Sequence, residues 1–124
     1  MLYNYIAVVK NVFDGDAITV DLDLGFGVTL VDRRLRLRGV DAPKMKTEDP
    51  NEKKRAYETR DFVKKKVAEV ENTIYIRTYK SGKFGKFISD VWLNKKDAEE
   101  GKFETTLNSL LLKNNLAIEF VHKE

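Results

Sequence analysis

The first forty residues alternate between apolar and polar positions, which is the pattern of β-strands with one buried face. Residues 3–13 are rich in β-branched and aromatic side chains and end at a turn-forming Asp-Gly-Asp sequence at 14–16. Residues 17–24 place isoleucine, valine and leucine on one face, with threonine and aspartate on the other. After a Gly-Phe-Gly reversal, residues 28–40 place leucines opposite arginines. These three strands predict an antiparallel meander.

Beyond Pro43 the chain becomes polar and then helical. Apolar residues between 51 and 70 recur at three- and four-residue spacing, which predicts an amphipathic helix. Two further strands follow, and then a polar connection, a second amphipathic helix and a short extended piece. These segments are residues 72–79 and 87–93 for the strands, 94–102 for the connection, 104–114 for the helix and 116–121 for the extended piece. We expect the second helix to end at Asn114–Asn115, since asparagine tolerates a left-handed cap.

The order of these elements is that of the OB-fold, a five-stranded barrel with a helix between its third and fourth strands. We therefore predict an α+β, mainly β fold with a second helix after the fifth strand, in one domain spanning residues 1–124. No apolar run is long enough to span a bilayer, and the N-terminus lacks the features of a secretory signal. We expect a cytoplasmic protein with no membrane partner, and we favour a monomer.

The residue types limit the chemistry. The chain has no cysteine and one histidine, which excludes disulfides, thiolate metal sites and clusters of histidine ligands. A metal would have to be held by oxygen atoms, which favours calcium or magnesium. The net charge is only +3, but lysines and arginines are concentrated between residues 33 and 46 and in three later clusters. Such clusters attract a polyanion, although on a helix they are also typical of a solvated face.

Three motifs carry the most specific signal: DGDAITV at 14–20, RLRGVDAP at 36–43 and GKFGKF at 82–87. Together they resemble the staphylococcal nuclease family, a group of OB-fold, calcium-dependent phosphodiesterases. The resemblance in the spacing of elements extends over nearly the whole chain, from about residue 5 to residue 120. The sequence DLDLGFGV at 21–28 also resembles short phage and bacterial members of the family.

The spacing of two aspartates agrees with such a site. Asp16 follows a glycine turn and Asp41 ends a strand, so that both carboxylates can reach one rim of a barrel, and two carboxylates, a carbonyl and waters suit calcium. Arg36 lies five residues before Asp41, which would place them on opposite faces of a regular strand. Gly39 offers a bend that would bring them together. The resemblance implies that Asp16, Asp41 and the Ala42 carbonyl bind calcium, and that Arg36 clamps a phosphate.

Two positions depart from the family pattern. Lys44 stands where the family has a glutamate that acts on the attacking water, and a protonated lysine cannot accept a proton from water. Lys86 stands where the family has a second phosphate-binding arginine, and lysine lacks the bidentate fork of the guanidinium. Both departures keep a cationic phosphate site while removing groups tied to hydrolysis.

We therefore predict a DNA- or RNA-binding protein with a degenerate catalytic site and weakened calcium affinity. Arg34 and Arg38 on the arginine face, with Lys83 and Phe84 in the loop before the fifth strand, are further candidate nucleic-acid contacts. One alternative is an active calcium-dependent nuclease, in which Glu48 or another acid of the 47–49 loop replaces the missing base. A second alternative is a protein-interaction module built on the barrel.

Overall fold

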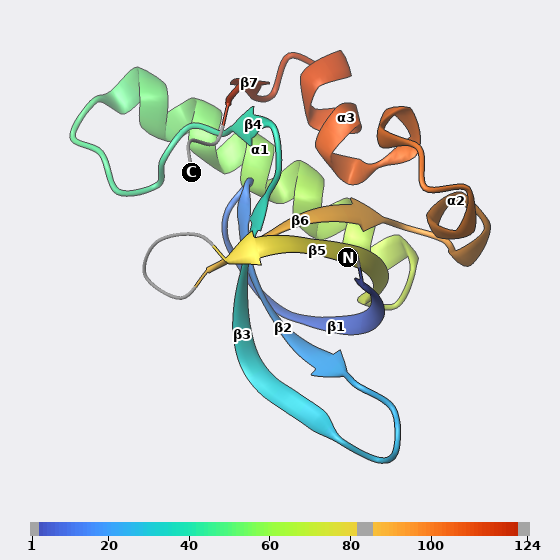
Figure 1. The fold of residues 1–124 in the computed structure, drawn as a ribbon. Coiled ribbons are helices and arrows are strands. Elements are labelled where there is room, and N and C mark those ends of the chain that lie inside the picture. The colour runs from blue at the N-terminus through green and yellow to red at the C-terminus, as the bar shows by residue number, and fades with distance from the viewer. Residues whose placement is uncertain (1–2, 82–85, 122–124) are drawn as a thin grey trace.

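Five strands of the computed structural model close into a barrel in the order β1-β2-β3-β6-β5 (Figure 1). The structure describes residues 3–81 and 86–121. The barrel strands are β1 (Tyr3–Asp14), β2 (Ala17–Asp23), β3 (Thr29–Leu37), β5 (Thr73–Ser81) and β6 (Phe87–Trp92). The β3–β6 pair that closes the barrel is parallel and its other pairs are antiparallel. The predicted meander and barrel are confirmed.

The helix between the third and fourth barrel strands is α1 (Pro50–Glu69). It begins where the Asp49 carboxylate accepts the N–H of Asn51 at 3.0 Å, with a proline in the first turn. Two of its buried residues, Val63 and Val67, belong to the hydrophobic core. In Figure 1 α1 lies across the end of the barrel opposite the tip of the β2–β3 hairpin. This placement confirms the OB-fold arrangement. Within the described ranges, no helix combines the length and the apolar character needed to cross a bilayer.

The second half of the chain holds one helix more than the sequence predicted. The region 94–102, predicted to be a polar connection, contains α2 (Lys95–Glu100). The Asn94 side chain caps it by accepting the N–H of Asp97 at 2.8 Å, and Gly101 ends it at a φ of 68°. The prediction for this segment was wrong because a helix of six residues that buries one of them, Ala98, shows no apolar periodicity.

The predicted second helix is confirmed in a shorter form. It consists of a 3-10 turn, η2 (Phe103–Thr105), followed by α3 (Leu107–Lys113). Asn115 adopts a φ of 56°, the left-handed conformation expected where this helix ends. The last extended piece is β7 (Ile118–Glu119), which pairs with β4 (Val40–Asp41). This pairing brings the end of the described chain close to Arg36 on β3.

The core follows from the alternation in the strands. The apolar positions of β2 and β3 that were assigned to one face are buried, with Leu35 and Leu37 fully so, while the arginines between and beside them reach solvent to different degrees. Beyond the barrel, the β2–β3 hairpin extends away from α1 (Figure 1) and ends in a turn in which Gly25, Phe26 and Gly27 all have positive φ. The Phe26 side chain at this tip is fully exposed.

Candidate phosphate-binding site

Four charged side chains, one from residue 16 and three from residues 36–44, meet at the end of the barrel that faces α1. Asp16 closes the turn between β1 and β2, Arg36 lies on β3, Asp41 lies on β4, and Lys44 follows β4. The turn is tied to β3 by the N–H of Leu37, which donates to the Asp16 carbonyl at 2.9 Å. This hydrogen bond holds Asp16 beside β3, the strand that carries Arg36.

The glycine of this turn allows it to approach α1 closely. A side chain at Gly15 would place its Cβ 2.2 Å from Cγ2 of Thr59 on α1. Thr59 is itself fixed, because its hydroxyl donates to the Leu116 carbonyl at 2.7 Å. Glycine is therefore required at this position for steric reasons.

The Lys44 ammonium lies between the two carboxylates. Its Nζ is 2.9 Å from Oδ2 and 3.3 Å from Oδ1 of Asp16, and 3.2 Å from Oδ1 of Asp41. Asp16 is fully buried and also accepts the N–H of Ala42 at 3.2 Å. Burial lowers the pKa of Lys44, but Asp16 and Asp41 together raise it above its usual value, so that the ammonium stays charged.

Arg36 contacts the same pair of carboxylates from β3. Its Nη1 is 3.5 Å from Asp16 Oδ2 and its Nη2 is 3.6 Å from Asp41 Oδ1. Gly39, with a φ of 80°, supplies the bend that was expected to bring Arg36 and Asp41 together. The guanidinium also lies 4.9 Å from the ring centroid of Phe120, a cation–π contact that the sequence did not suggest.

This arrangement does not fit a resident calcium ion. Two cations, Arg36 and Lys44, already neutralise the two carboxylates, and the ammonium occupies the space between them. A divalent ion would have to displace Lys44 before it could contact both acids. Among the residues that the structure describes, no three acidic, histidine or cysteine side chains are grouped to hold a metal. The calcium roles expected for Asp16, Asp41 and the Ala42 carbonyl therefore stay a prediction that this pairing of charges argues against.

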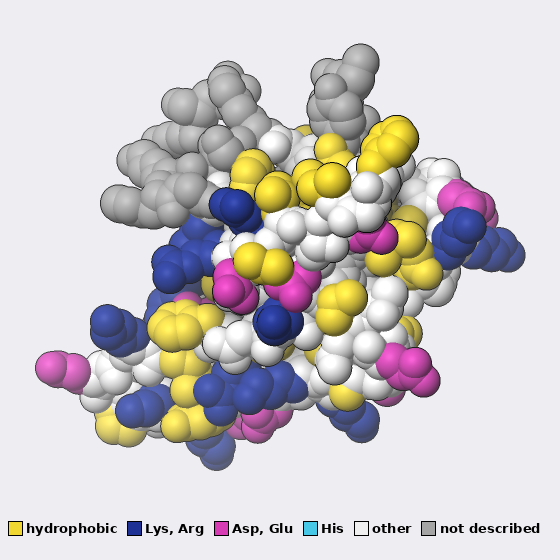
Figure 2. Space-filling view, turned by 90° about the horizontal axis from the view of Figure 1, so that it is seen from below, with side chains coloured by type: hydrophobic (Ala, Val, Ile, Leu, Met, Phe, Trp, Pro, Cys, Tyr) yellow, Lys and Arg dark blue, Asp and Glu magenta, His cyan; other side chains and the backbone are white. Residues whose placement is uncertain are grey.

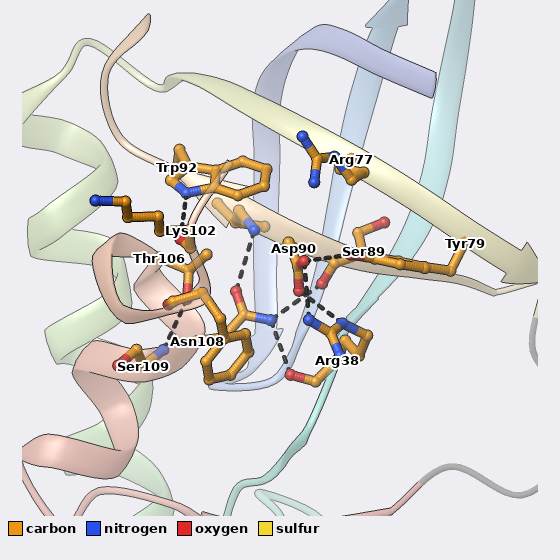
Figure 3. Close-up of polar contacts among 12 residues, drawn as sticks. Arg38, Arg77, Tyr79, Ser89, Asp90, Trp92, Lys102, Thr106, Asn108 and Ser109 are labelled. Carbon is orange, nitrogen blue, oxygen red and sulfur yellow. Dashed lines mark hydrogen bonds and ion pairs between the residues drawn. The ribbon is translucent and has the colours of Figure 1, made fainter. Parts of the chain in front are cut away.

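Arg38 is held by a different partner. Its Nε and Nη2 donate to the two oxygens of Asp90 at 2.9 and 3.1 Å, and the Tyr79 hydroxyl donates to the same carboxylate at 2.6 Å (Figure 3). The guanidinium also lies 4.8 Å from the ring centroid of Tyr79 and 5.1 Å from that of Phe103. The hydrogen bond to Asp90 raises the pKa of Arg38. In this arrangement Arg38 links β3 to β5 and β6, and any contact with nucleic acid would have to share it with Asp90.

Asn108 is a structural residue that the sequence did not reveal. Its Nδ2 donates to the carbonyls of Arg38 and Ser89 at 2.9 and 3.1 Å, and its Oδ1 accepts the N–H of Val91 (Figure 3). These bonds join α3 to the residue that follows β3 and to the middle of β6. An asparagine inside a leucine-rich helix was the available signal, since a buried amide needs hydrogen-bond partners.

The acids considered as replacements for the missing base lie in the loop that leads into α1. Glu48 is exposed, and Asp49 caps α1. The acid that the sequence did not single out is Glu52, which accepts the Thr47 hydroxyl at 2.7 Å and faces the Lys44 N–H at 3.5 Å. Its position three residues after the helix cap is that of a capping box, which was the available signal.

Of the remaining predicted contacts, Arg34 is exposed on the same strand as Arg36, and Lys86 directly precedes β6. Lys83 and Phe84 lie outside the described residues.

The closed five-stranded barrel, with its helix after the third strand and its charged cluster at one end, defines an OB-fold domain with a candidate site for anions. The chain belongs to the family of staphylococcal nuclease homologues, whose model matches residues 34–124. This range includes Arg36, Asp41, Lys44 and Lys86, and begins after the Asp-Gly-Asp turn. The family in general depends on calcium. A search of curated proteins gave no match.

Proposed function

We propose that the protein binds DNA or RNA through the phosphate backbone and hydrolyses it little or not at all. The observation that carries this proposal is the position of the Lys44 ammonium, 2.9 Å from one carboxylate and 3.2 Å from the other. A lysine in this position supplies a fixed positive charge where the family pattern has a general base. Family membership supports nucleic acid as the ligand.

The site suits a phosphate group because its cations are held in place. Arg36 is fixed by Asp16, Asp41 and the ring of Phe120, so that little side-chain entropy is lost when it binds. A guanidinium has five N–H groups, and the contacts with the two aspartates leave others free for phosphate oxygens. Long-range attraction comes from the other basic residues of the 33–46 segment.

The same site is poor for hydrolysis. Lys44 is charged and cannot accept a proton, and a missing general base costs about 10²–10⁴ in rate. A lysine at 86 in place of an arginine weakens the stabilisation of the transition state by a further factor of about 10²–10³. The two losses need not multiply, because such residues act together. Either loss is enough to make the protein a weak phosphodiesterase.

Binding and cleavage of a fluorescently labelled single-stranded oligonucleotide test the proposal. We expect binding by anisotropy with the same affinity in calcium and in chelator, with a logarithm of the association constant that falls linearly with the logarithm of the salt concentration. On a gel, we expect no products. Arg36→Gln should weaken binding, with Lys65→Gln on the exposed face of α1 as the control for loss of one charge.

Two other outcomes would replace the proposal. Cleavage that a chelator abolishes would show an active calcium-dependent nuclease, the function that the family would otherwise suggest. The absence of salt-dependent binding to either DNA or RNA would instead favour a protein-interaction module.

A further inference from the structure

A groove of about 240 Å³ lies beside the phosphate site, across the outer face of β1, β2 and β3. Its lining includes Asn11 and Phe13 from β1, Ala17 and Thr19 from β2, Arg34 from β3, and Lys86. The Phe13 side chain is 56% exposed, although phenylalanine is among the residue types that are most often buried in folded proteins. The groove therefore combines an open aromatic surface with two cations.

The strand register makes this groove continuous with the phosphate site. Asn11 pairs with Thr19, and Thr19 pairs with Arg34, so that these side chains form one row across the sheet. The next row on the same face pairs Ala17 with Arg36. Successive side chains on one face of a strand are about 7 Å apart. A chain molecule with one phosphate at Arg36 can therefore reach the groove with its next residue.

The charges of the groove select an anion. Its lining contains two cations, Arg34 and Lys86, and no carboxylate, and neither cation forms an ion pair with a residue that the structure describes. The larger cleft of about 380 Å³ next to Asp41 is different, because Glu52 and Glu58 also line it. Figure 2 shows Lys and Arg side chains beside hydrophobic ones on the face of the molecule seen from the hairpin side.

We propose that this groove, formed around Phe13, Arg34 and Lys86, binds one unpaired nucleotide of a single-stranded nucleic acid whose neighbouring phosphate lies at Arg36. Phe13 stacks on the base, and Arg34 and Lys86 contact the next phosphate along the strand. The amide of Asn11 and the hydroxyl of Thr19 lie where they can reach the sugar or the base edge. A base in a duplex is already stacked and paired, so that this groove favours single strands. The inference rests on the proposed function.

The test compares matched variants for binding to a labelled single strand and to a duplex of the same sequence. Phe13→Ala should weaken single-strand binding roughly 5- to 150-fold, the effect of losing one stacked base. Phe26→Ala removes the exposed aromatic side chain at the hairpin tip and should change binding less than about twofold.

The charge of the groove is tested by the salt dependence of binding. Arg34→Gln should reduce the slope of the logarithm of the association constant against the logarithm of the salt concentration by about 1. Arg33→Gln is the same change one residue away and outside the groove lining, and it should reduce this slope less. Thermal melting shows whether each variant is folded.

Binding by the wild type and by two variants distinguishes failure of the groove proposal from failure of the proposed function. If the wild type binds and Arg36→Gln weakens binding, but Phe13→Ala binds single strands as the wild type does, the groove proposal is overturned and the proposed function stands. Equal affinity for duplex and single strand would also overturn it. If the wild type binds neither DNA nor RNA, both proposals fail.

Discussion

A double variant, Lys44→Glu with Lys86→Arg, is expected to cleave single-stranded DNA in calcium at least about 100-fold faster than the wild type. The first change removes the ammonium that lies between Asp16 and Asp41 and places a third carboxylate beside them. The second restores a bidentate phosphate donor. Three carboxylates are a more suitable set for calcium than two that are already neutralised.

The control for this experiment distinguishes removal of the Lys44 ammonium from the addition of a carboxylate at the same position. Lys44→Met removes the ammonium without supplying a carboxylate, and is expected to show no such gain. Cleavage is measured as product formed per unit time, with and without chelator. Wild-type cleavage at a rate close to that of the double variant would contradict the degenerate-site proposal.

An Asp16→Asn variant is expected to lower the free energy of unfolding by about 3 kcal/mol, the lower end of the cost of breaking a buried ion pair. Asp16 is fully buried and contacts both Lys44 and Arg36. Loss of its charge leaves two cations with Asp41 as their shared acidic partner. The cost stays near the lower end because the Lys44 side chain is 37% exposed and can turn toward water.

The matched control is Asp41→Asn, which changes the same chemical group with the same two basic partners. Asp41 is 35% exposed, so that its ion pairs are screened and its replacement should cost about 1 kcal/mol or less. Chemical denaturation of both variants measures the difference. Equal losses of stability would show that burial of Asp16 does not make its charge essential to the fold.

Local sequence patterns predicted the barrel because each strand alternates apolar and polar residues over a few consecutive positions. Ile18, Val20 and Leu22 alternate with polar positions, and burial follows that alternation. The partner of Arg38 could not be predicted in the same way. Asp90 lies 52 residues further along the chain, and the register between β3 and β6 that brings them together is a property of the closed barrel.

The charged cluster could be predicted in part. The motifs and the glycine at 39 indicated that Arg36 and Asp41 would meet, because a left-handed glycine lets a strand turn between them. The sequence placed Lys44 near the aspartates but did not show that its ammonium contacts both. That contact depends on the path of the 42–45 loop, which is held by the Met45 N–H donating to Asp14 at 2.8 Å.

Calorimetric titration of the wild-type protein with calcium tests most directly whether the Lys44 ammonium takes the place of a metal ion. Because Asp16 and Asp41 are already paired with cations, we predict no saturable heat of binding up to about 1 mM calcium, the weak end of the range for protein calcium sites. Saturable binding of calcium by the wild type that Asp16→Asn abolishes would contradict this account.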